Sequence, residues 1–328
     1  MSSPENPAYL WWNHELRSWD ECCVHLSDNW WASVGAVFEG IRGYLNEAEG
    51  ETYIFRLDAH LARLSNSMRL MRMDCDSFPQ DELRQATCEL VRANGVAGDV
   101  YIMPLAYATG GRSFGAVGER VTNLFITSRP TTSTLGQEDH SLRAGFSSWT
   151  RIGDRSMPPR VKAIANYRNS QLASHEAALN GYDTALLLNH EGKVAEGPGS
   201  CVFFARDGRL FTPDLTSGIL ESITRDSVIQ IARHVLGIAV EERPVDRTEA
   251  YLADEAFFCG TAAEVTPISS IDHYDLKAGA PGPITRELRQ LYHGLVRGVN
   301  HHFPEWRAPV GLTGQPLAAT RTATRVPW

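Results

Sequence analysis

Hydrophobic residues recur along the chain with a helical period in several segments. Over 57–72, leucine and methionine follow one another every three or four residues, which predicts an amphipathic helix. A second helix is expected over 80–93, between a turn containing Pro79 and the helix-ending pair Asn94-Gly95. The same criteria predict helices over 166–180, 222–236, 248–253 and 284–299.

Short runs rich in β-branched and aromatic residues, bounded by polar turns, predict strands. They lie at 9–13, 24–26, 100–107, 121–127, 142–149, 184–188, 201–205 and 255–259. Residues 109–115 form a glycine-rich loop of the kind that carries functional residues. Strands and helices do not alternate strictly, which favours two α/β (α+β) layers over one doubly wound sheet.

A chain of 328 residues is long for a single hydrophobic core and is expected to form two domains. The segment 128–136 is rich in Pro, Ser and Thr and lacks apolar periodicity, as linkers do. We therefore predict a small N-terminal α/β domain over 1–130, a linker over 131–136 and a large domain over 137–300. Residues 301–328 are expected to form a loosely held tail.

The composition narrows the functional classes. A net charge of −8 argues against a nucleic-acid partner, and no apolar run is long enough to cross a membrane. The six cysteines lack metal-ligand spacing, so we expect reduced thiols and no bound metal. The N-terminal residues have neither the basic start nor the apolar core of a secretory signal, which favours a cytoplasmic location.

Lysine is rare in this chain, and one lysine has unusual neighbours. Three lysines stand beside 28 arginines, and both Lys193 and Lys277 lie in polar turns. Lys162 instead lies among small and apolar residues, in Val161-Lys162-Ala163-Ile164. A desolvated lysine loses its proton readily and can attack a carbonyl carbon to form an imine, which arginine cannot do. The alternative is a surface lysine whose stem packs on its apolar neighbours.

An imine-forming lysine that binds pyridoxal phosphate needs a carboxylate partner for the pyridine nitrogen of the cofactor. Glu196 is the candidate, because it ends a short strand before glycines that allow a close backbone approach. It could equally be a solvated glutamate in a turn.

The phosphate needs an anion-binding cradle, and the chain offers two. Ser222-Ile223-Thr224 opens a helix, although Ser222 could be an ordinary N-cap. Gly260-Thr261-Ala262-Ala263 follows a strand, although it could be a plain turn. Arg63 could add a bidentate guanidinium or be an exposed helix arginine.

These residues lie in a series of motifs that resembles the class IV pyridoxal-phosphate aminotransferases, most closely the branched-chain amino acid aminotransferases. The resemblance covers about residues 9–298. It is very specific, because eight motifs occur in the order and spacing of the family. The motifs are Val37-Phe38-Glu39-Gly40-Ile41-Arg42, His60-Leu61-Ala62-Arg63-Leu64, Tyr101-Ile102-Met103-Pro104-Leu105, Lys162 to Tyr167, Glu196-Gly197-Pro198-Gly199, Ile223-Thr224-Arg225-Asp226, Tyr251-Leu252-Ala253-Asp254-Glu255 and Gly260-Thr261-Ala262-Ala263-Glu264-Val265-Thr266-Pro267-Ile268.

The resemblance implies a two-domain α/β (α+β) fold of the D-amino acid aminotransferase-like type, with pyridoxal 5'-phosphate between the domains and the large domain as the cofactor-binding one. It implies a homodimer or a higher homo-oligomer, in which the partner's glycine-rich segment 108–118 closes each pocket. The partners would be a small-molecule amino donor and a 2-oxo acid acceptor, with no nucleic acid and no membrane.

The resemblance also implies roles for individual residues. Lys162 would bind the cofactor as an internal aldimine and move the substrate proton. Tyr167 would hydrogen-bond the phenolic oxygen of the cofactor, and Glu196 would pair with its pyridine nitrogen. The phosphate would be held by Arg63, the Ile223 backbone, Thr224 and Thr261, with Leu220 against the ring. The Thr261 and Ala262 amides would bind the α-carboxylate of the substrate. The residues implied to bind the substrate are Phe38, Tyr101, Met103, Ser33 and Ala262.

Three departures from the family pattern bear on the substrate. Met103 stands where the family has an arginine, and Ser33 where a tyrosine is expected; Glu221-Ser222 replaces Pro-Gly. If glutamate is a donor, another arginine such as Arg112 or Arg42 must stand in. We expect a transaminase that moves an amino group between an apolar, branched-chain-like amino acid and a 2-oxo acid.

Two other functions remain open from the sequence. The first is a D-amino acid or (R)-amine transaminase, or an aminodeoxychorismate lyase-type enzyme, of the same fold. The second is a non-catalytic binding or regulatory protein, against which the joint presence of Lys162, Tyr167, Glu196 and Thr224 argues.

Overall fold

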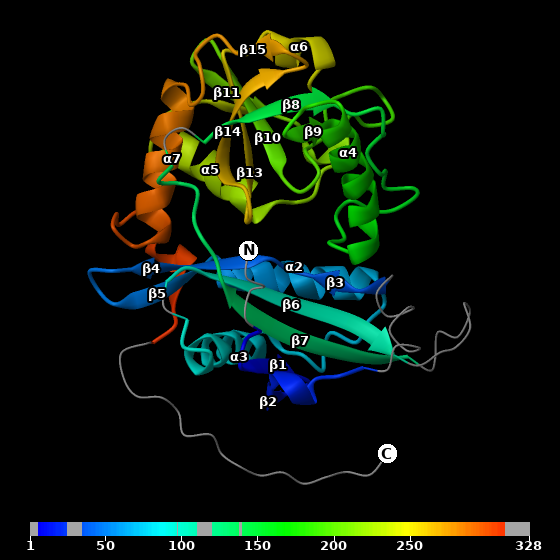
Figure 1. Cartoon of the computed structure of the whole chain (residues 1–328), viewed down its shortest axis with the longest axis vertical. Helices are drawn as coiled ribbons and strands as arrows, with labels where there is room; N and C mark the ends of the chain where they lie inside the picture. Colours follow the sequence, from blue (N-terminus) through cyan, green and yellow to red (C-terminus); the bar gives the residue numbers. More distant parts are fainter. Residues whose placement is uncertain (1–5, 25–34, 97, 110–119, 138–139, 312–328) are drawn as a thin grey trace.

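The structure is a computed structural model that describes residues 6–24, 35–96, 98–109, 120–137 and 140–311. Within these residues the chain forms two eight-stranded sheets, one above the other in Figure 1. None of the helices in the described part is long and apolar enough to cross a membrane. Most of the predicted strand over 24–26, and most of the predicted loop over 108–118, lie outside the described residues.

The first sheet is antiparallel throughout and has the strand order β16-β5-β4-β6-β7-β1-β2, with β3 paired to β6. Its strands are β1 (Tyr9–Trp12), β2 (Glu15–Ser18), β3 (Val37–Phe38), β4 (Ile41–Asn46), β5 (Glu51–Phe55), β6 (Val100–Thr109), β7 (Val121–Pro130) and β16 (Arg307–Pro309). Helices α2 (Leu57–Leu70) and α3 (Gln80–Ala93) cover one face of this sheet (Figure 1).

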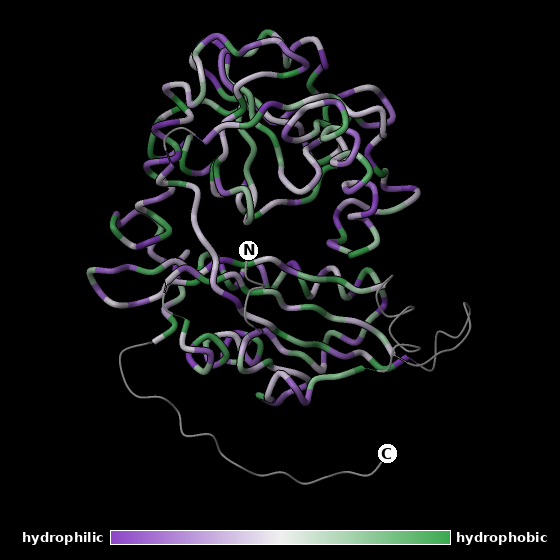
Figure 2. The backbone as a smooth tube through the Cα atoms, in the orientation of Figure 1, coloured by the Kyte–Doolittle hydropathy of each residue, from purple (hydrophilic) through white to green (hydrophobic). Residues whose placement is uncertain are grey.

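The alternation of side chains along β6 separates the two faces of the first sheet. Val100, Ile102 and Ala106 are fully buried in the core beneath α2 and α3. Tyr101 and Met103 therefore point to the opposite face. In Figure 2 the strands of this sheet carry much of the hydrophobic colouring of the lower layer.

The second sheet is mixed and has the strand order β12-β11-β10-β13-β14-β8-β9, with β15 paired to β14. Strand pairs β8–β9, β8–β14 and β11–β12 are parallel, and the others are antiparallel. Its strands are β8 (Leu142–Phe146), β9 (Thr184–Leu186), β10 (Cys201–Arg206), β11 (Arg209–Thr212), β12 (Val240–Glu242), β13 (Glu255–Gly260), β14 (Glu264–Ile271) and β15 (Tyr274–Asp275).

Helices pack on the second sheet through apolar clusters on both of its faces. On one face, Phe203 and Phe257 stack against each other in a core that α5 and α7 complete. On the other face, Phe204 and Phe258 belong to a second core. The helices are α4 (Tyr167–Leu179), α5 (Ile223–His234), α6 (Arg247–Tyr251) and α7 (Pro283–Val296), and the 3₁₀ turns are Trp19–Glu21, Ile164–Asn166, Leu215–Ser217 and Pro304–Trp306.

The predicted helices are confirmed, and α3 begins and ends at the predicted residues. Strands β4, β5 and β14 were not predicted, because they are buried on both faces and so lack polar alternation. The strand predicted over 142–149 ends already at Phe146.

The prediction of a loose tail from residue 301 is wrong for residues 304–310. Strand β16 pairs with β5 and forms an edge of the first sheet. Trp306, Ala308 and Val310 are buried, and the Trp306 ring meets Phe55 edge-on at 6.0 Å. This three-residue strand is stabilised by pairing with a strand some 250 residues earlier in the chain. The local sequence therefore gave no sign of it.

Candidate active site

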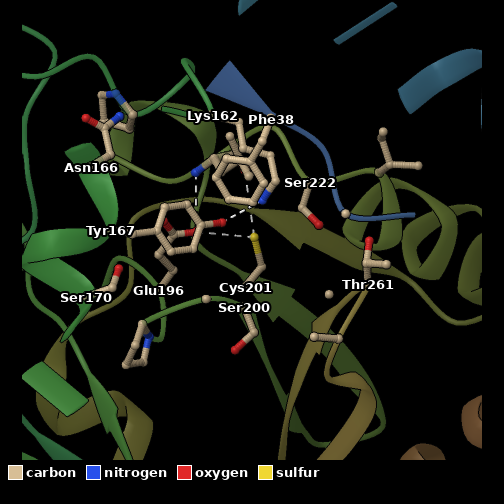
Figure 3. A pocket seen from close by; sticks show the side chains of 18 of the residues that line it. Phe38, Lys162, Asn166, Tyr167, Ser170, Glu196, Ser200, Cys201, Ser222 and Thr261 are labelled. Atoms are coloured by element: carbon tan, nitrogen blue, oxygen red, sulfur yellow. Dashed lines mark hydrogen bonds between the residues drawn. The ribbon is translucent and has the colours of Figure 1, made fainter. Parts of the chain in front are cut away.

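A cavity of about 210 Å³ lies between the two sheets and holds most of the predicted site residues. The first part of the chain contributes Phe38, Gly40, Arg63 and Tyr101. Figure 3 shows Lys162, Tyr167, Glu196 and Cys201 pointing toward one another from the second part. The predicted residues that line the cavity are Phe38, Arg63, Tyr101, Lys162, Tyr167, Glu196, Leu220, Ile223, Thr261 and Ala262.

Lys162 lies inside this cavity because its backbone is tied to the first sheet. Its carbonyl oxygen accepts a hydrogen bond from the Phe38 amide at 3.0 Å, and a β-bridge joins Val37 to Ala163. The Lys162 Nζ atom lies 2.6 Å from the Tyr167 hydroxyl and 4.7 Å from the centre of the Phe38 ring (Figure 3). These contacts favour the chemical interpretation of Lys162 over that of a surface lysine.

The Glu196 carboxylate is buried, with only 4% of the residue exposed, so it is not a solvated turn residue. Its Oε1 atom lies 2.5 Å from Nη2 of Arg151, which is itself buried. Its Oε2 atom accepts from the Leu220 amide at 3.3 Å and from the Cys201 thiol at 3.6 Å. Arg151 was not found in the sequence analysis, since nothing in its local pattern distinguishes it from the other arginines.

The start of α5 forms a corner of the cavity that is suited to an anion. The first amides of a helix have no intrahelical acceptor, and the helix dipole makes this end positive. Ile223 and Ser222 line the cavity there, and the Ser222 hydroxyl accepts from the Arg225 amide at 3.2 Å as an N-cap. Thr224 is buried beside the cavity and its side chain interacts with Tyr292.

Arg63 reaches the same corner from α2, and it is not an exposed helix arginine because only 11% of its side chain is accessible. Its Nη1 donates to the Glu221 carbonyl at 2.7 Å, just before α5. The Glu221 carboxylate points elsewhere and forms a half-exposed ion pair with Arg160 at 2.9 Å. The backbone of Glu221, rather than its charge, therefore meets the site.

Glu39 is a buried partner of Arg63 to which the sequence analysis gave no role, although its motif was recognised. It also accepts a hydrogen bond from His60, whose Nδ1 atom lies 2.7 Å from Oε2. Burial alone would raise the pKa of the Glu39 carboxyl, but the charge of Arg63 and the hydrogen bonds from Arg63 and His60 outweigh it and lower the pKa to about 2. The carboxylate is thus charged, and the Nδ1 atom of His60 must carry the proton between them.

Tyr101 enters the cavity from β6 beside Gly40. A Cβ atom at Gly40 would lie 2.2 Å from the Tyr101 hydroxyl, so only glycine leaves room for this side chain. Burial, together with the nearby Tyr167, raises the pKa of Tyr101, which keeps its hydroxyl protonated and able to donate.

The other predicted substrate residues are placed differently. Met103 is absent from the lining of the first cavity, and instead lines a largely apolar cavity of about 470 Å³ with Trp12, Leu105 and Phe125. Ser33 and Arg112 lie outside the described residues. Met103 and Ser33 remain predictions as substrate residues.

Arg42 does not present its guanidinium to the cavity. It is 6% exposed, and its Nη1 and Nη2 atoms donate to the carbonyl oxygens of Thr132 and Ala262 at 3.1 and 3.3 Å. Nη1 also lies 3.4 Å from Oε1 of Glu264, with which it forms a buried ion pair. This engagement argues against Arg42 as the stand-in for the arginine that Met103 replaces.

Comparison with known proteins agrees with this geometry. The family model for amino-transferase class IV matches residues 36–271. The chain belongs to the class IV aminotransferases. A probable branched-chain-amino-acid aminotransferase from Aquifex aeolicus is 39% identical over 295 residues, which are 89% of this chain and 93% of that protein.

Solved structures extend the comparison to the fold of this class IV aminotransferase. The branched-chain amino acid aminotransferase of Thermobaculum terrenum in its PLP form is 65% identical, with a TM-score of 0.91 over 94% of this chain and 99% of that one. The enzyme of Thermoproteus uzoniensis, solved with norvaline, is 40% identical, with a TM-score of 0.85 over 93% and 99% of the two chains. The predicted resemblance and the predicted class IV fold are confirmed.

Proposed function

We propose that this class IV aminotransferase uses pyridoxal phosphate to move an amino group between an apolar, branched-chain-like amino acid and a 2-oxo acid. One observation carries the proposal: the Lys162 amine, the buried Glu196 carboxylate and the start of α5 all line a single cavity. The relatives support it, since the Aquifex aeolicus protein is named a probable branched-chain-amino-acid aminotransferase and the Thermobaculum terrenum enzyme was solved in a PLP form.

The residues present fit the cofactor in three places. Lys162 supplies an amine for its aldehyde, and Glu196 supplies an ionisable acceptor for its pyridine nitrogen. Arg63 and the first amides of α5 suit its phosphate. Pyridoxal phosphate, when bound, supplies a ring that takes up electron density from the α-carbon of the substrate.

The side chains of the protein would transfer the substrate proton and hold the reacting groups in position. Lys162 is placed to remove the proton from the substrate α-carbon and to return it, a task that needs an amine held at a fixed point. The Tyr167 hydroxyl, 2.6 Å away, and the Phe38 ring provide that orientation. Arg151 and the Leu220 amide keep the Glu196 carboxylate in place, so the acceptor does not have to reorganise during the reaction.

The substrate would lie on the side of the cavity lined by Phe38, Tyr101 and the turn that contains Thr261 and Ala262. Amides at this turn would bind the α-carboxylate, and the Tyr101 hydroxyl could donate a further hydrogen bond. The Phe38 and Tyr101 rings on this side suit an apolar substrate side chain. The solution of the Thermoproteus uzoniensis enzyme with norvaline is consistent with such a substrate.

The proposal includes a homodimer in the cytoplasm. The resemblance to the family implies the dimer, and the cavity lined by Trp12, Met103, Leu105 and Phe125 is largely apolar, as a contact with another chain would be. A second copy would cover this face of the first sheet and contribute its segment 108–118 to the neighbouring active site. Analytical ultracentrifugation should show a dimer; a monomer at micromolar concentration would contradict this part.

The decisive test is chemical. The protein is incubated with pyridoxal phosphate, reduced with borohydride and digested, and the peptides are weighed; the added mass is expected on Lys162. Absorbance is then followed while L-leucine, D-alanine or (R)-1-phenylethylamine is added, and L-leucine is expected to convert the cofactor fastest. Label on another residue, or on none, would refute the proposal, and preference for D-alanine or the amine would assign the activity to the alternative transaminase class.

A further inference from the structure

Glu264 begins strand β14 directly after the turn that lines the cavity at Thr261 and Ala262. It is fully buried, and its backbone has a φ of +53°, in the left-handed region that non-glycine residues rarely adopt. A residue persists in such a conformation when surrounding contacts determine it. No step of the proposed mechanism uses Glu264.

Five hydrogen bonds or ion-pair contacts converge on the Glu264 carboxylate. Oε1 accepts from Tyr44 at 3.0 Å and from Ser133 at 2.8 Å, and it lies 3.4 Å from Nη1 of Arg42. Oε2 accepts from both the amide and the hydroxyl of Thr134, at 2.7 and 3.0 Å. The donors come from strand β4 of the first sheet and from the chain segment that connects the two sheets.

These contacts also reach the turn itself. Arg42, held by Glu264, donates through Nη2 to the Ala262 carbonyl at 3.3 Å. The Thr266 hydroxyl donates to the next carbonyl, that of Ala263, at 2.5 Å. The first bond holds the peptide group between Ala262 and Ala263, and the second holds the one between Ala263 and Glu264. These peptide groups directly follow the two that carry the Thr261 and Ala262 amides, so the contacts fix the end of the turn that lines the cavity.

We infer that Glu264 is a positioning residue for the substrate α-carboxylate: by holding Arg42 and the segment between the sheets, it fixes the turn whose amides receive that carboxylate. The inference rests on the proposed function. Glu264 itself does not touch the substrate, so its effect should depend on whether the substrate has a carboxylate at all.

A substrate pair tests this dependence in Glu264→Gln. L-Leucine carries the α-carboxylate, and 3-methylbutylamine is the same molecule without it. The glutamine removes the charge and presents an NH₂ group to donors, so the turn should loosen and kcat/KM for leucine should fall about 100-fold, the size expected for a small misplacement at a site. The half-reaction rate with 3-methylbutylamine should stay within about twofold, so the leucine-to-amine ratio falls.

A binding measurement that needs no turnover tests the same role of Glu264. The cofactor-loaded enzyme is titrated with 4-methylpentanoate, which has the carboxylate and no amine. Its affinity should fall in Glu264→Gln, while the affinity for pyridoxal phosphate, followed by absorbance, should not. This measurement decides the question if the wild-type protein does not turn over the amine.

Glu255→Gln is the matched control. Glu255 is also buried in the second sheet and accepts hydrogen bonds from the Ile284 amide and from the amide and hydroxyl of Thr285, at the start of α7. Its substitution should lower stability without changing the ratio between leucine and the amine. Should Glu264→Gln fail to fold, Tyr44→Phe, which removes one donor, should shift the ratio in the same direction.

An unchanged leucine-to-amine ratio together with unchanged 4-methylpentanoate affinity would overturn the inference. That result would leave the proposed function intact, provided that the wild type is labelled at Lys162 and converts leucine. A wild type that is not labelled there would instead refute the proposed function.

Discussion

Glu39 binds Arg63 through both carboxylate oxygens, with Nε to Oε1 and Nη2 to Oε2 each 2.7 Å apart. The guanidinium is thereby fixed in one plane, and its remaining nitrogen reaches the Glu221 carbonyl at the start of α5. Such a fork geometry adds orientation as well as energy. The pair therefore presents Arg63 to the corner proposed for the phosphate and ties α2 to the second half of the molecule.

Glu39→Gln should make the protein less stable at neutral pH and less sensitive to acid. The folded pKa of Glu39, about 2, lies below its ordinary value of 4.5, so its stabilising contribution is complete above about pH 4.5 and is lost as the pH falls toward 2. The shift corresponds to about 3 kcal/mol. Denaturation series at several pH values should show this loss, with a flatter acid limb in the variant.

Glu15→Gln is the control for that series, because Glu15 forms an exposed ion pair with Arg17 and should change the free energy of unfolding by less than about 1 kcal/mol. If Glu39→Gln kept the stability and acid dependence of the wild type, the buried pair would not contribute as described.

Lys162→Ala should abolish transamination, with a rate loss on the order of 10⁴-fold, while the protein remains folded. The side chain is half-buried and its only described polar contact at Nζ is with Tyr167, so the thermal midpoint should change little. Lys162→Arg keeps the charge without the chemistry and should be equally inactive. Turnover at the wild-type rate in either variant would refute the assignment.

Glu196→Gln should retain the cofactor and its visible absorbance but slow the half-reaction by about 10²- to 10³-fold, the range seen when one electrostatic partner is removed. The neutral amide cannot stabilise a positive charge on the ring nitrogen as a carboxylate does. Stopped-flow absorbance with leucine measures the rate. Glu191→Gln, in an exposed neighbouring turn, should match the wild type, and an equally fast Glu196→Gln would mean that another group holds the ring proton.

Met103→Arg should raise activity with glutamate relative to leucine, because the resemblance to the family implies that an arginine at this position pairs with the distal carboxylate of glutamate. Met103→Leu preserves the apolar cavity and should leave the glutamate-to-leucine ratio unchanged. If Met103→Arg also leaves it unchanged, donor recognition lies elsewhere, and Arg129 is the first described residue to substitute. Its guanidinium lies 5.2 Å from the centre of the Tyr101 ring.

The linear pattern of residues was enough to predict the helices and to propose the chemistry of the site. Helical periodicity and caps are local properties, which is why α3 could be placed to the residue. Ser222, predicted as part of a phosphate cradle with an N-cap as the alternative, does cap α5. The types of residue at Lys162 and Glu196 also point to their chemistry without any contact being known.

Folding was needed to bring distant partners together. Strand β16 exists because β5 supplies its hydrogen bonds, and Arg42 meets Glu264 across 222 positions in the chain. Met103 lines the apolar cavity and not the first one, a placement that depends on how the sheets pack. A single buried charge gives no sign of its partner in the sequence, because the two are matched by position in space and not by spacing along the chain.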